Sequence, residues 1–301
     1  MGTLQVIRSA QWTDYELIDC GNSEKLERFG KYVLRRPEPQ AIWEPKLPQS
    51  DWEKLPDATY IRTKDKADMV WNSEKGNWIN HRKMPESWMV KYHSENLDFT
   101  MRLALTAFGH IGVFPEQSVN WEFIAGQVRA MKCPEKNVLN LFAYTGAASI
   151  AASMTGAVVT HVDSVKQTIT WANSNHSLSK GKDNIRWVVE DAVRFVGREL
   201  RRGNSYNGII LDPPAYGRGP AGEKWLLIEG LNALVADCAQ ILDKENFFFL
   251  INIYSVGLSA IVVENVVKSH FPEAKTVSGE ITIPSQQGVS LPLGVYVRFG
   301  S

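Results

Sequence analysis

The chain contains little cysteine. Its three cysteines, Cys20, Cys133 and Cys238, lie far apart in 301 residues and form no C-x-x-C pair. The six histidines show neither the His-x3-His nor the His-Glu-x-x-His spacing of zinc sites. We therefore expect a reduced, cytoplasmic protein that uses no metal ion.

The sequence also lacks an excess of charge of either sign and a long apolar run. Acidic and basic side chains number 33 each, so an RNA-binding role would need a local basic surface rather than a global field. No apolar run approaches the roughly 18 residues that span a bilayer, and the N-terminus has no signal-peptide core. We expect a soluble chain that does not enter a membrane.

The first part of the chain has the texture of a small β domain. Up to about residue 100 it contains frequent prolines and short alternating runs such as YELIDCG and KYVLRR, which predicts a small β-rich domain over residues 1–100. Tryptophan is abundant here. We expect these rings to fill a thin core, although aromatic rings beside Lys and Arg are also typical of nucleic-acid surfaces. The tryptophans are Trp12, Trp43, Trp52, Trp71, Trp78 and Trp88.

From about residue 136 the pattern becomes regular. Short apolar runs alternate with helix-like stretches, which predicts parallel strands joined by helical crossovers over residues 136–301. A connecting segment with a helix near its end covers residues 101–135. The last two apolar runs, EITIP and GVYVRF, predict a terminal hairpin. The parallel runs are NVLNLF, VVTHVD, IRWVVED, YNGIILD and FFFLINIYS.

Acidic residues end three successive predicted strands. Asp163 ends VVTHVD, Glu190 and Asp191 end IRWVVED, and Asp212 ends YNGIILD. The carboxyl ends of parallel strands line one crevice, so these side chains should converge on one ligand. Each could instead cap the helix that follows it, because aspartate is a favoured N-cap residue.

A turn of small residues follows the first parallel strand, in VLNLFAYTGAAS. Gly146, Ala147 and Ala148 would let a ligand approach the backbone and the helix N-terminus. The turn lacks the G-x-G-x-x-G pattern, which disfavours an NAD-dependent oxidoreductase. Asp163 lies 17 positions beyond Gly146, where a doubly wound fold places a carboxylate that accepts ribose hydroxyls. Together these features predict a nucleoside-containing cofactor.

The motif series resembles that of class I S-adenosylmethionine-dependent methyltransferases. The residues that carry the resemblance are VLNLFAYTGAAS, Asp163, Asp191 and DPPAY, and NLFAYTG with DPPAY is especially similar to the bacterial 23S (large-subunit) rRNA methyltransferases. The resemblance covers about residues 110–301. It implies an α/β fold with a Rossmann-like, seven-stranded, mostly parallel sheet that ends in an antiparallel hairpin strand, alongside the small N-terminal β-rich domain.

The resemblance also implies S-adenosyl-L-methionine as cofactor, and it implies roles by position. Asp163 would bind the ribose hydroxyls, and Asp191 with Ala192 would lie at the adenine. Asp212, Pro213 and Pro214 would face the reactive methyl group and the acceptor, and Tyr216 would cover the acceptor. The other cofactor-binding candidates, from NLFAYTG and from GVFPEQSVNW, are Phe142, Ala143, Tyr144, Gly146 and Gln117.

Two departures from the family pattern bear on the substrate. In GVFPEQSVNW, Gln117 and Asn120 match relatives, but Ser118 and Trp121 replace arginines. Relatives that methylate C5 of a pyrimidine place a cysteine in the DPP loop or after the next strand, because a thiolate must add to C6. Here those places read DPPAYGRGP and INIYSVG. We therefore predict transfer to a nitrogen of an RNA base, and the resemblance implies that this RNA is rRNA.

Other acceptors and other roles stay open. A methyltransferase that acts on a small molecule or a protein, or a non-catalytic cofactor-binding module, would carry the same cofactor motifs. For RNA, KYVLRRP at 31–37 and INHRKMP at 79–85 are candidates for phosphate contact, and Arg218 is the best-placed single cation. A further basic helix face, expected to be solvated, carries Arg194, Arg198, Arg201 and Arg202.

Overall fold

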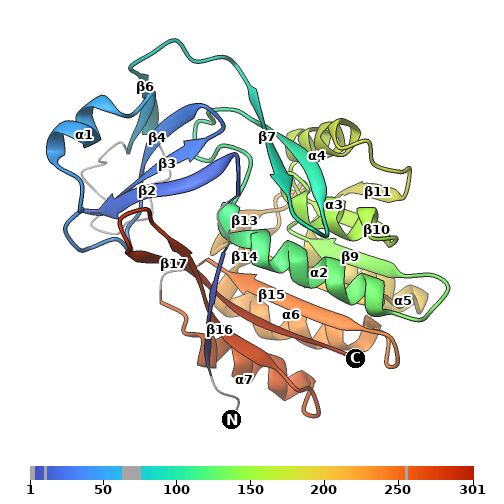
Figure 1. Cartoon of the computed structure of the whole chain (residues 1–301). Helices are drawn as coiled ribbons and strands as arrows, with labels where there is room; N and C mark the ends of the chain where they lie inside the picture. The colour runs from blue at the N-terminus through green and yellow to red at the C-terminus, as the bar shows by residue number, and fades with distance from the viewer. Residues whose placement is uncertain (1–3, 10–11, 63–75, 255–256) are drawn as a thin grey trace. The chain divides into compact units, whose positions relative to one another are not determined.

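The computed structural model describes residues 4–9, 12–62, 76–254 and 257–301. The chain divides into two compact units (Figure 1). The first unit comprises Met1–Ile7, Gln117–Ile281 and Gly294–Ser301, and the second comprises Arg8–Glu116 and Thr282–Leu293. The second unit thus extends beyond residue 100 and takes in the tip of the C-terminal hairpin.

The first unit is built on an eight-stranded sheet in the order β1-β16-β17-β15-β12-β9-β10-β11. Strands β11, β10, β9, β12 and β15 are parallel, and β17 pairs antiparallel with β15. The mostly parallel sheet and its terminal hairpin are confirmed. The strands are β1 (Gln5–Arg8), β9 (Asn137–Leu141), β10 (Val158–Asp163), β11 (Ile185–Val189), β12 (Gly208–Leu211), β15 (Phe248–Ile253), β16 (Val277–Pro284) and β17 (Ser290–Gly300).

The sheet has one strand more than the sequence predicts. The eighth strand, β1, comes from the stretch expected in the small domain and lies beside β16. Gly279 of β16 permits this close approach, because a Cβ atom there would lie 1.7 Å from the carbonyl oxygen of Gln5. Such an edge pairing depends on a partner far away in the sequence, and the four residues of β1 give no clear periodic signal.

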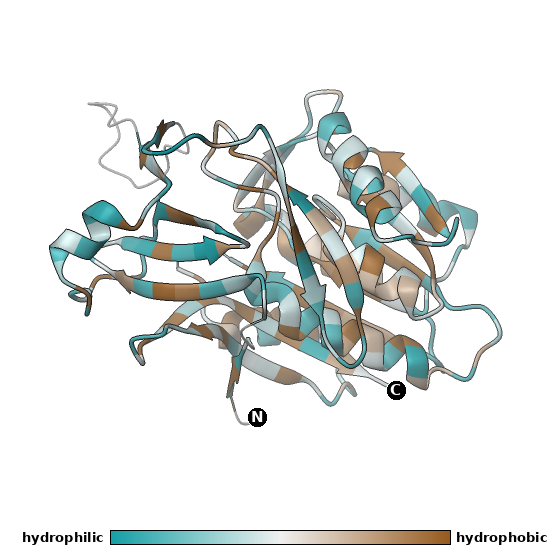
Figure 2. Cartoon of the chain, turned by 45° about the horizontal axis from the view of Figure 1, so that its top comes forward, coloured by the Kyte–Doolittle hydropathy of each residue, from teal (hydrophilic) through white to brown (hydrophobic). Residues whose placement is uncertain are grey.

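Helices cover both faces of the sheet (Figure 1). Strands β12 and β15 are buried along their whole length, as parallel strands with two covered faces must be. One face carries α2, α3 and α4, and the other carries α5, α6 and α7. Bands of brown and teal along these helices in Figure 2 mark their hydrophobic and hydrophilic residues. The helices are α2 (Ser118–Ala130), α3 (Ala147–Met154), α4 (Lys166–Leu178), α5 (Ala192–Arg202), α6 (Leu227–Ile241) and α7 (Ala260–His270).

Apolar residues recur at spacings of three and four over residues 225–242, a pattern that predicts one helix with a single apolar stripe. Helix α6 begins later than this pattern predicts, although Leu231, Leu234 and Cys238 do form a buried stripe. Trp225 and Ile228 would extend this stripe, but Ile228 is 83% exposed and Trp225 lies in a strand before the helix. That strand, β14 (Lys224–Leu226), pairs antiparallel with β13 (Tyr216–Arg218), and the pairing delays the start of the helix.

The second unit contains a five-stranded sheet in the order β2-β3-β4-β5-β6 and a separate two-stranded ribbon, β7-β8. The runs YELIDCG and KYVLRR do form strands, as predicted. The elements are β2 (Tyr15–Gly21), β3 (Glu24–Phe29), β4 (Tyr32–Pro37), α1 (Gln49–Lys54), β5 (Ala58–Arg62), β6 (Gly76–Asn80), β7 (Trp88–His93) and β8 (Asp98–Leu103), followed by the 3-10 turn Pro115–Gln117.

Three of the six tryptophans that we expected in the core of the second unit are buried there. Trp12, Trp52 and Trp88 are at most 8% exposed. Trp43 and Trp78 are half-buried, and their indole N–H groups donate to the carbonyl oxygens of Cys20 (2.9 Å) and Thr106 (2.8 Å). Trp71 lies outside the described residues. None of the described helices has the length and apolarity to cross a membrane.

Candidate active site

The parallel strands end level with one another. Leu141 of β9 lies opposite Val162 and Leu211, and Leu211 lies opposite Ile251. The residues that follow these strands therefore meet at one edge of the sheet, where ligands of doubly wound folds bind. This edge gathers the three predicted aspartates, the small-residue turn and the DPP loop.

The turn after β9 has a strained backbone. Phe142 has φ 56°, Tyr144 has φ 50° and Gly146 has φ 92°, so three alternate residues adopt the left-handed conformation. Only glycine does so without cost, and the penalty for a bulky residue is about 1–2 kcal/mol. Strain of this kind persists where surrounding contacts fix the backbone, and it is typical of ligand-binding loops.

Asp163 fixes this turn from the neighbouring strand. Its Oδ2 accepts a hydrogen bond from the backbone N–H of Tyr144 at 3.0 Å, and its Oδ1 accepts from Val165 at 2.9 Å. Burial raises the pKa of the Asp163 carboxyl, and the backbone N–H groups act in the opposite direction. A carboxylate oxygen has two lone pairs, so Asp163 can hold the turn and bind ligand hydroxyls at once.

A buried polar network supports the turn from below. The side chain of Asn140 donates to Ser149 Oγ at 2.9 Å, and Ser149 Oγ lies 2.9 Å from His161 Nδ1. Burial lowers the pKa of His161 to about 3, so the imidazole is neutral at physiological pH. Gly146 packs tightly against α4, because a Cβ atom there would lie 3.1 Å from Ala172 Cβ. The backbone of the turn therefore has little room to move.

Asp191 caps the next helix. Its Oδ1 accepts from the backbone N–H of Arg194 at 2.9 Å, which makes it the N-cap of α5. Both Asp191 and Ala192 are buried at the edge of the sheet. The neighbouring Glu190 is paired with Arg198 (2.8 Å) and does not compete for the same ligand. The cap uses one carboxylate oxygen, which leaves the other for a ligand donor.

Asp212 forms a side-chain hydrogen bond that the sequence did not predict. Asn252, at the end of β15, donates from Nδ2 to Asp212 Oδ1 at 3.1 Å. Burial raises the pKa of Asp212 to about 6, and the bond from Asn252 acts in the opposite direction. The signal was present in the sequence as one amide within the apolar run FFFLINI, where a buried Asn needs a polar partner. Asn252 is 2% exposed.

The DPP loop is tied to the turn after β9 through Trp225. Its indole N–H donates to the carbonyl oxygen of Pro214 at 2.7 Å, and its ring lies 5.1 Å from that of Phe142. Pro213 is buried and carries no backbone donor. Tyr216 is 51% exposed, and its hydroxyl accepts from Arg218 Nε at 2.7 Å. The aromatic ring of Tyr216 is thus open to a ligand rather than packed into the core.

Gln117 lies at the N-terminal end of α2, where its Oε1 accepts from Asn120 Nδ2 at 2.8 Å. Helix α2 leads into the start of β9 through residues 131–136, so it runs opposite to the strand. Its N-terminal end therefore lies at the same edge of the sheet as the turn after β9.

No cysteine of the first unit lies at this edge. Cys238 is buried in the apolar stripe of α6, and burial raises the pKa of its thiol. Cys133 lies in the loop before β9, at the opposite edge, and Cys20 lies in β2 of the second unit. Within the described ranges, no group of three or more His, Cys, Asp or Glu side chains is placed to hold a metal ion.

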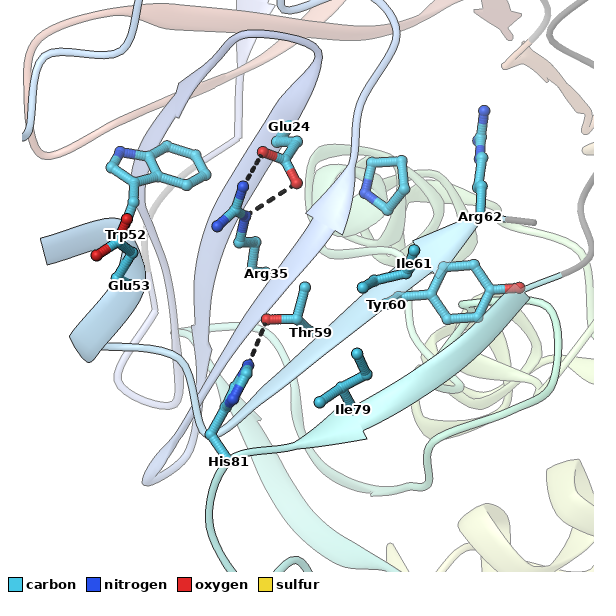
Figure 3. A pocket seen from close by; sticks show the side chains of 11 residues that line it. Glu24, Arg35, Trp52, Glu53, Thr59, Tyr60, Ile61, Arg62, Ile79 and His81 are labelled. Atoms are coloured by element: carbon cyan, nitrogen blue, oxygen red, sulfur yellow. Dashed lines mark hydrogen bonds and ion pairs between the residues drawn. The ribbon is translucent and has the colours of Figure 1, made fainter. Parts of the chain in front are cut away.

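The second unit has a groove of about 440 Å³ on one face of its sheet (Figure 3). Two of its charged residues pair with each other, because Nε and Nη2 of Arg35 donate to Glu24, and His81 Nε2 lies 2.9 Å from Thr59 Oγ1. Other cations of the two candidate phosphate-binding stretches are also paired, Arg36 with Glu27 and Arg82 with Asp57. These stretches therefore present less free positive charge than their sequences indicate.

The arginines of α5 show the same behaviour. Arg194 is paired with Glu223, Arg198 with Glu190, and Arg202 with Glu199 at 3.1 Å. Arg201 is exposed at the end of the helix, which places it at the edge of the sheet opposite the site.

No family model matches the chain. Among solved structures, it is similar to a SAM-dependent methyltransferase from Agrobacterium tumefaciens, with a TM-score of 0.89, 33% identity, and coverage of 99% of this chain and 94% of that one. A methyltransferase structure from Streptococcus mutans shares the fold, with a TM-score of 0.71 and 16% identity over 96% of this chain and 75% of that one.

Curated relatives carry the name ribosomal RNA large subunit methyltransferase K/L. The protein of Pseudoalteromonas atlantica is 33% identical over 116 residues, which cover 38% of this chain and 15% of that relative. The protein of Alteromonas mediterranea is 24% identical over 293 residues, which cover 91% of this chain and 40% of that relative. The chain thus spans less than half the length of these curated relatives.

Proposed function

The chain belongs to the S-adenosylmethionine-dependent methyltransferases, and from this premise we propose that it methylates a nitrogen of a base in ribosomal RNA. The observation that carries the proposal is the position of Asp212, whose carboxylate is held by Asn252 at the same sheet edge as the strained turn. The names of the curated relatives support RNA as the substrate. A ribosomal substrate would also locate the enzyme in the cytoplasm.

The residues at the sheet edge fit the cofactor. The left-handed turn at Phe142, Tyr144 and Gly146 exposes backbone groups to the methionine moiety, with Ala143 between them. Helix α3 has no capping side chain at Gly146, so its first N–H groups favour the methionine carboxylate. Gln117 would border the same region from α2. This cofactor supplies a methyl group on a sulfonium, which is already activated for transfer.

The two upstream aspartates would position the nucleoside half. Asp163 would accept the ribose hydroxyls with its remaining lone pairs, while its backbone bonds fix its orientation. Asp191 would accept from the exocyclic amine of adenine with the oxygen that the helix cap leaves free, and Ala192 leaves space for the ring. In a doubly wound fold the ribose and then the adenine lie beyond the ends of successive strands, which supports ribose binding after β10 and adenine binding after β11.

The DPP loop would position the acceptor. Asp212 would accept a hydrogen bond from an amino or ring N–H of the base, which directs the nitrogen lone pair at the methyl group. Transfer would break the bond between the methyl group and the sulfonium, release S-adenosylhomocysteine as a neutral thioether and leave positive charge on the nitrogen. The Asp212 carboxylate would oppose this charge and accept the proton that the nitrogen then loses. Pro213 and Pro214 add no competing N–H donor, and the exposed ring of Tyr216 would stack on the base.

Nitrogen is favoured over pyrimidine C5 because no thiol of the first unit lies near the DPP loop. Activation of C5 by covalent addition needs a thiolate at C6, whereas the three cysteines lie in α6, in the loop before β9 and in the second unit.

Two measurements test the proposal. Calorimetric titration with S-adenosylhomocysteine should show binding that Asp163→Ala weakens strongly and Asp212→Asn barely changes. Labelled methyl transfer to unmodified large-subunit rRNA, followed by digestion and mass spectrometry of the nucleosides, should place the methyl group on nitrogen. A methylated pyrimidine C5, or equal loss of binding in both variants, would contradict the assignment.

A different acceptor class has one observation in its favour. Most arginines in the basic clusters of both units form ion pairs with acidic side chains. They therefore offer little free charge to phosphates, which suits a small-molecule or protein acceptor as well as RNA. Methylation of RNA with a rate that does not depend on salt concentration would favour this alternative, because phosphate contacts give a steep salt dependence.

A further inference from the structure

A short hairpin follows the DPP loop directly. In β13 and β14, Tyr216 lies opposite Leu226, Gly217 opposite Trp225, and Arg218 opposite Lys224. Residues directly opposite in an antiparallel pair share a face, and neighbours along a strand alternate. One face of the hairpin therefore carries Gly217 and Trp225, and the other carries Tyr216, Arg218, Lys224 and Leu226.

The first face anchors the hairpin on the site. Trp225 is 4% exposed and is bonded to Pro214. The hairpin packs closely here: a Cβ atom on Gly217 would lie 3.6 Å from Pro214 Cγ, and one on Gly230 of α6 would lie 2.6 Å from the Trp225 ring. The hairpin is thus fixed to the DPP loop and moves with it.

The second face is open to solvent and positively charged. All four of its side chains are exposed. The one acidic residue of the connecting loop, Glu223, is paired with Arg194 of α5 and accepts from the N–H of Ala221. In the part of the chain that the structure describes, no carboxylate forms an ion pair with Arg218 or Lys224. These two cations differ in this respect from most arginines of the basic clusters described above.

The pairing of Arg218 with Lys224 carries a cost. Like charges directly opposite each other on a sheet destabilise the pair, and the cross-strand Cβ atoms lie only about 5 Å apart. Arg218 Nε donates to the Tyr216 hydroxyl, which holds the guanidinium beside the ring and leaves Nη1 and Nη2 for a ligand. A bound anion between the two cations would remove the repulsion.

We infer that this face of the hairpin binds the RNA backbone next to the acceptor nucleotide, with Arg218 and Lys224 on phosphates and Tyr216 against a base. The inference rests on RNA as the proposed substrate. Phosphate contacts would fix the register of the strand, while Asp212 holds the acceptor base. Leu226 supplies apolar contact to the sugar.

The test compares two double variants that each remove two exposed charges. Arg218→Gln with Lys224→Gln neutralises the hairpin, and Arg201→Gln with Lys244→Gln is the matched control at the opposite edge of the sheet. The KM for unmodified large-subunit rRNA and its dependence on salt concentration are measured for each, together with kcat and the affinity for S-adenosylhomocysteine.

The hairpin variant should raise the KM for RNA roughly tenfold and reduce the slope of log KM against log salt by about 1.4, since each phosphate contact on a single strand contributes about 0.7. Affinity for S-adenosylhomocysteine should match the wild type, and the control should change neither quantity. Single variants Arg218→Gln and Lys224→Gln should each show about half of the slope change, which keeps the test available if the double variant folds poorly.

The outcomes separate this inference from the proposed function. If the wild type methylates RNA with a steep salt dependence and the hairpin variants behave like it, the hairpin assignment is wrong and the substrate assignment stands. If the wild type neither methylates RNA nor shows salt-dependent binding, both are overturned.

Discussion

Asn252 and Asp212 join the carboxyl ends of β15 and β12 by a hydrogen bond of 3.1 Å from Nδ2 to Oδ1. The bond fixes the position of Oδ1, and because the carboxylate is planar and rigid it also limits where Oδ2 can lie. It also stabilises the ionised form of a carboxyl whose pKa burial raises to about 6. Asn252 therefore acts on the reaction through Asp212, as a positioning residue.

The pH dependence of turnover should follow Asp212. The ionised carboxylate is the hydrogen-bond acceptor, so kcat should rise as the pH passes through about 6 and level off above it. Asn252→Ala removes a bond that lowers this pKa, so its profile should move to higher pH. Single-turnover rates between pH 4.5 and 8.5 would check this, with Asn232→Ala on α6 as control. If the pH dependence of kcat in Asn252→Ala matched that of the wild type, Asn252 would not act on turnover through the pKa of Asp212.

Replacement of Asp212 by Asn should stabilise the protein while it abolishes turnover. The pKa of Asp212 in the folded state, about 6, lies above the ordinary 3.8, so the folded state binds more protons between these values and its stability falls as the pH rises through them. At pH 7.5 the free energy of unfolding of Asp212→Asn, measured by urea denaturation, should exceed that of the wild type by on the order of 1–3 kcal/mol. The gain should vanish near pH 4. A gain that is the same at both pH values would contradict this origin.

Gly146 and Gly126 offer a matched pair of alanine substitutions. Gly146 has φ 92° and its Cβ atom would press on Ala172, so Gly146→Ala should cost about 1–2 kcal/mol of stability and weaken binding of S-adenosylhomocysteine. Gly126 lies exposed within α2 with open space around it, so Gly126→Ala should stabilise by about 0.5–1 kcal/mol. Urea unfolding and calorimetry would measure both; a harmless Gly146→Ala would argue against a strained, ligand-binding turn.

The sequence predicted the sheet edge well because its signals are local. Apolar runs that end in Asp163, Asp191 and Asp212 identify parallel strands and their carboxyl ends, and sheet geometry then brings these residues together. The proposed cofactor-binding roles of Phe142 and Tyr144 also come from one short motif, NLFAYTG. The left-handed backbone of both residues is a physical feature of a ligand-binding turn that the sequence alone does not reveal.

What the sequence could not predict depends on distant partners. The strands around Trp225 have three residues each, too few for a period-2 signal, and contacts with Phe142 and Pro214 outweigh the helical spacing of that region. The charge on Arg36 is balanced by Glu27 on the neighbouring strand, which no count of basic residues reveals. Asn252 reaches Asp212 across 40 positions of sequence.

Trp225→Phe should separate chemistry from cofactor binding. Phenylalanine keeps an aromatic ring near Phe142 but lacks the N–H that holds the carbonyl of Pro214 at 2.7 Å, so the DPP loop should lose its orientation while the turn after β9 stays packed. We expect kcat with saturating RNA to fall about tenfold, because misplacement of an acceptor is costly, and the affinity for S-adenosylhomocysteine to change less than twofold. Trp78→Phe in the second unit loses an indole bond of the same kind, to Thr106 at 2.8 Å, and should leave kcat unchanged. Equal loss of kcat in both variants would show that the effect is one of general stability, and an unchanged kcat in Trp225→Phe would show that the DPP loop keeps its orientation without Trp225.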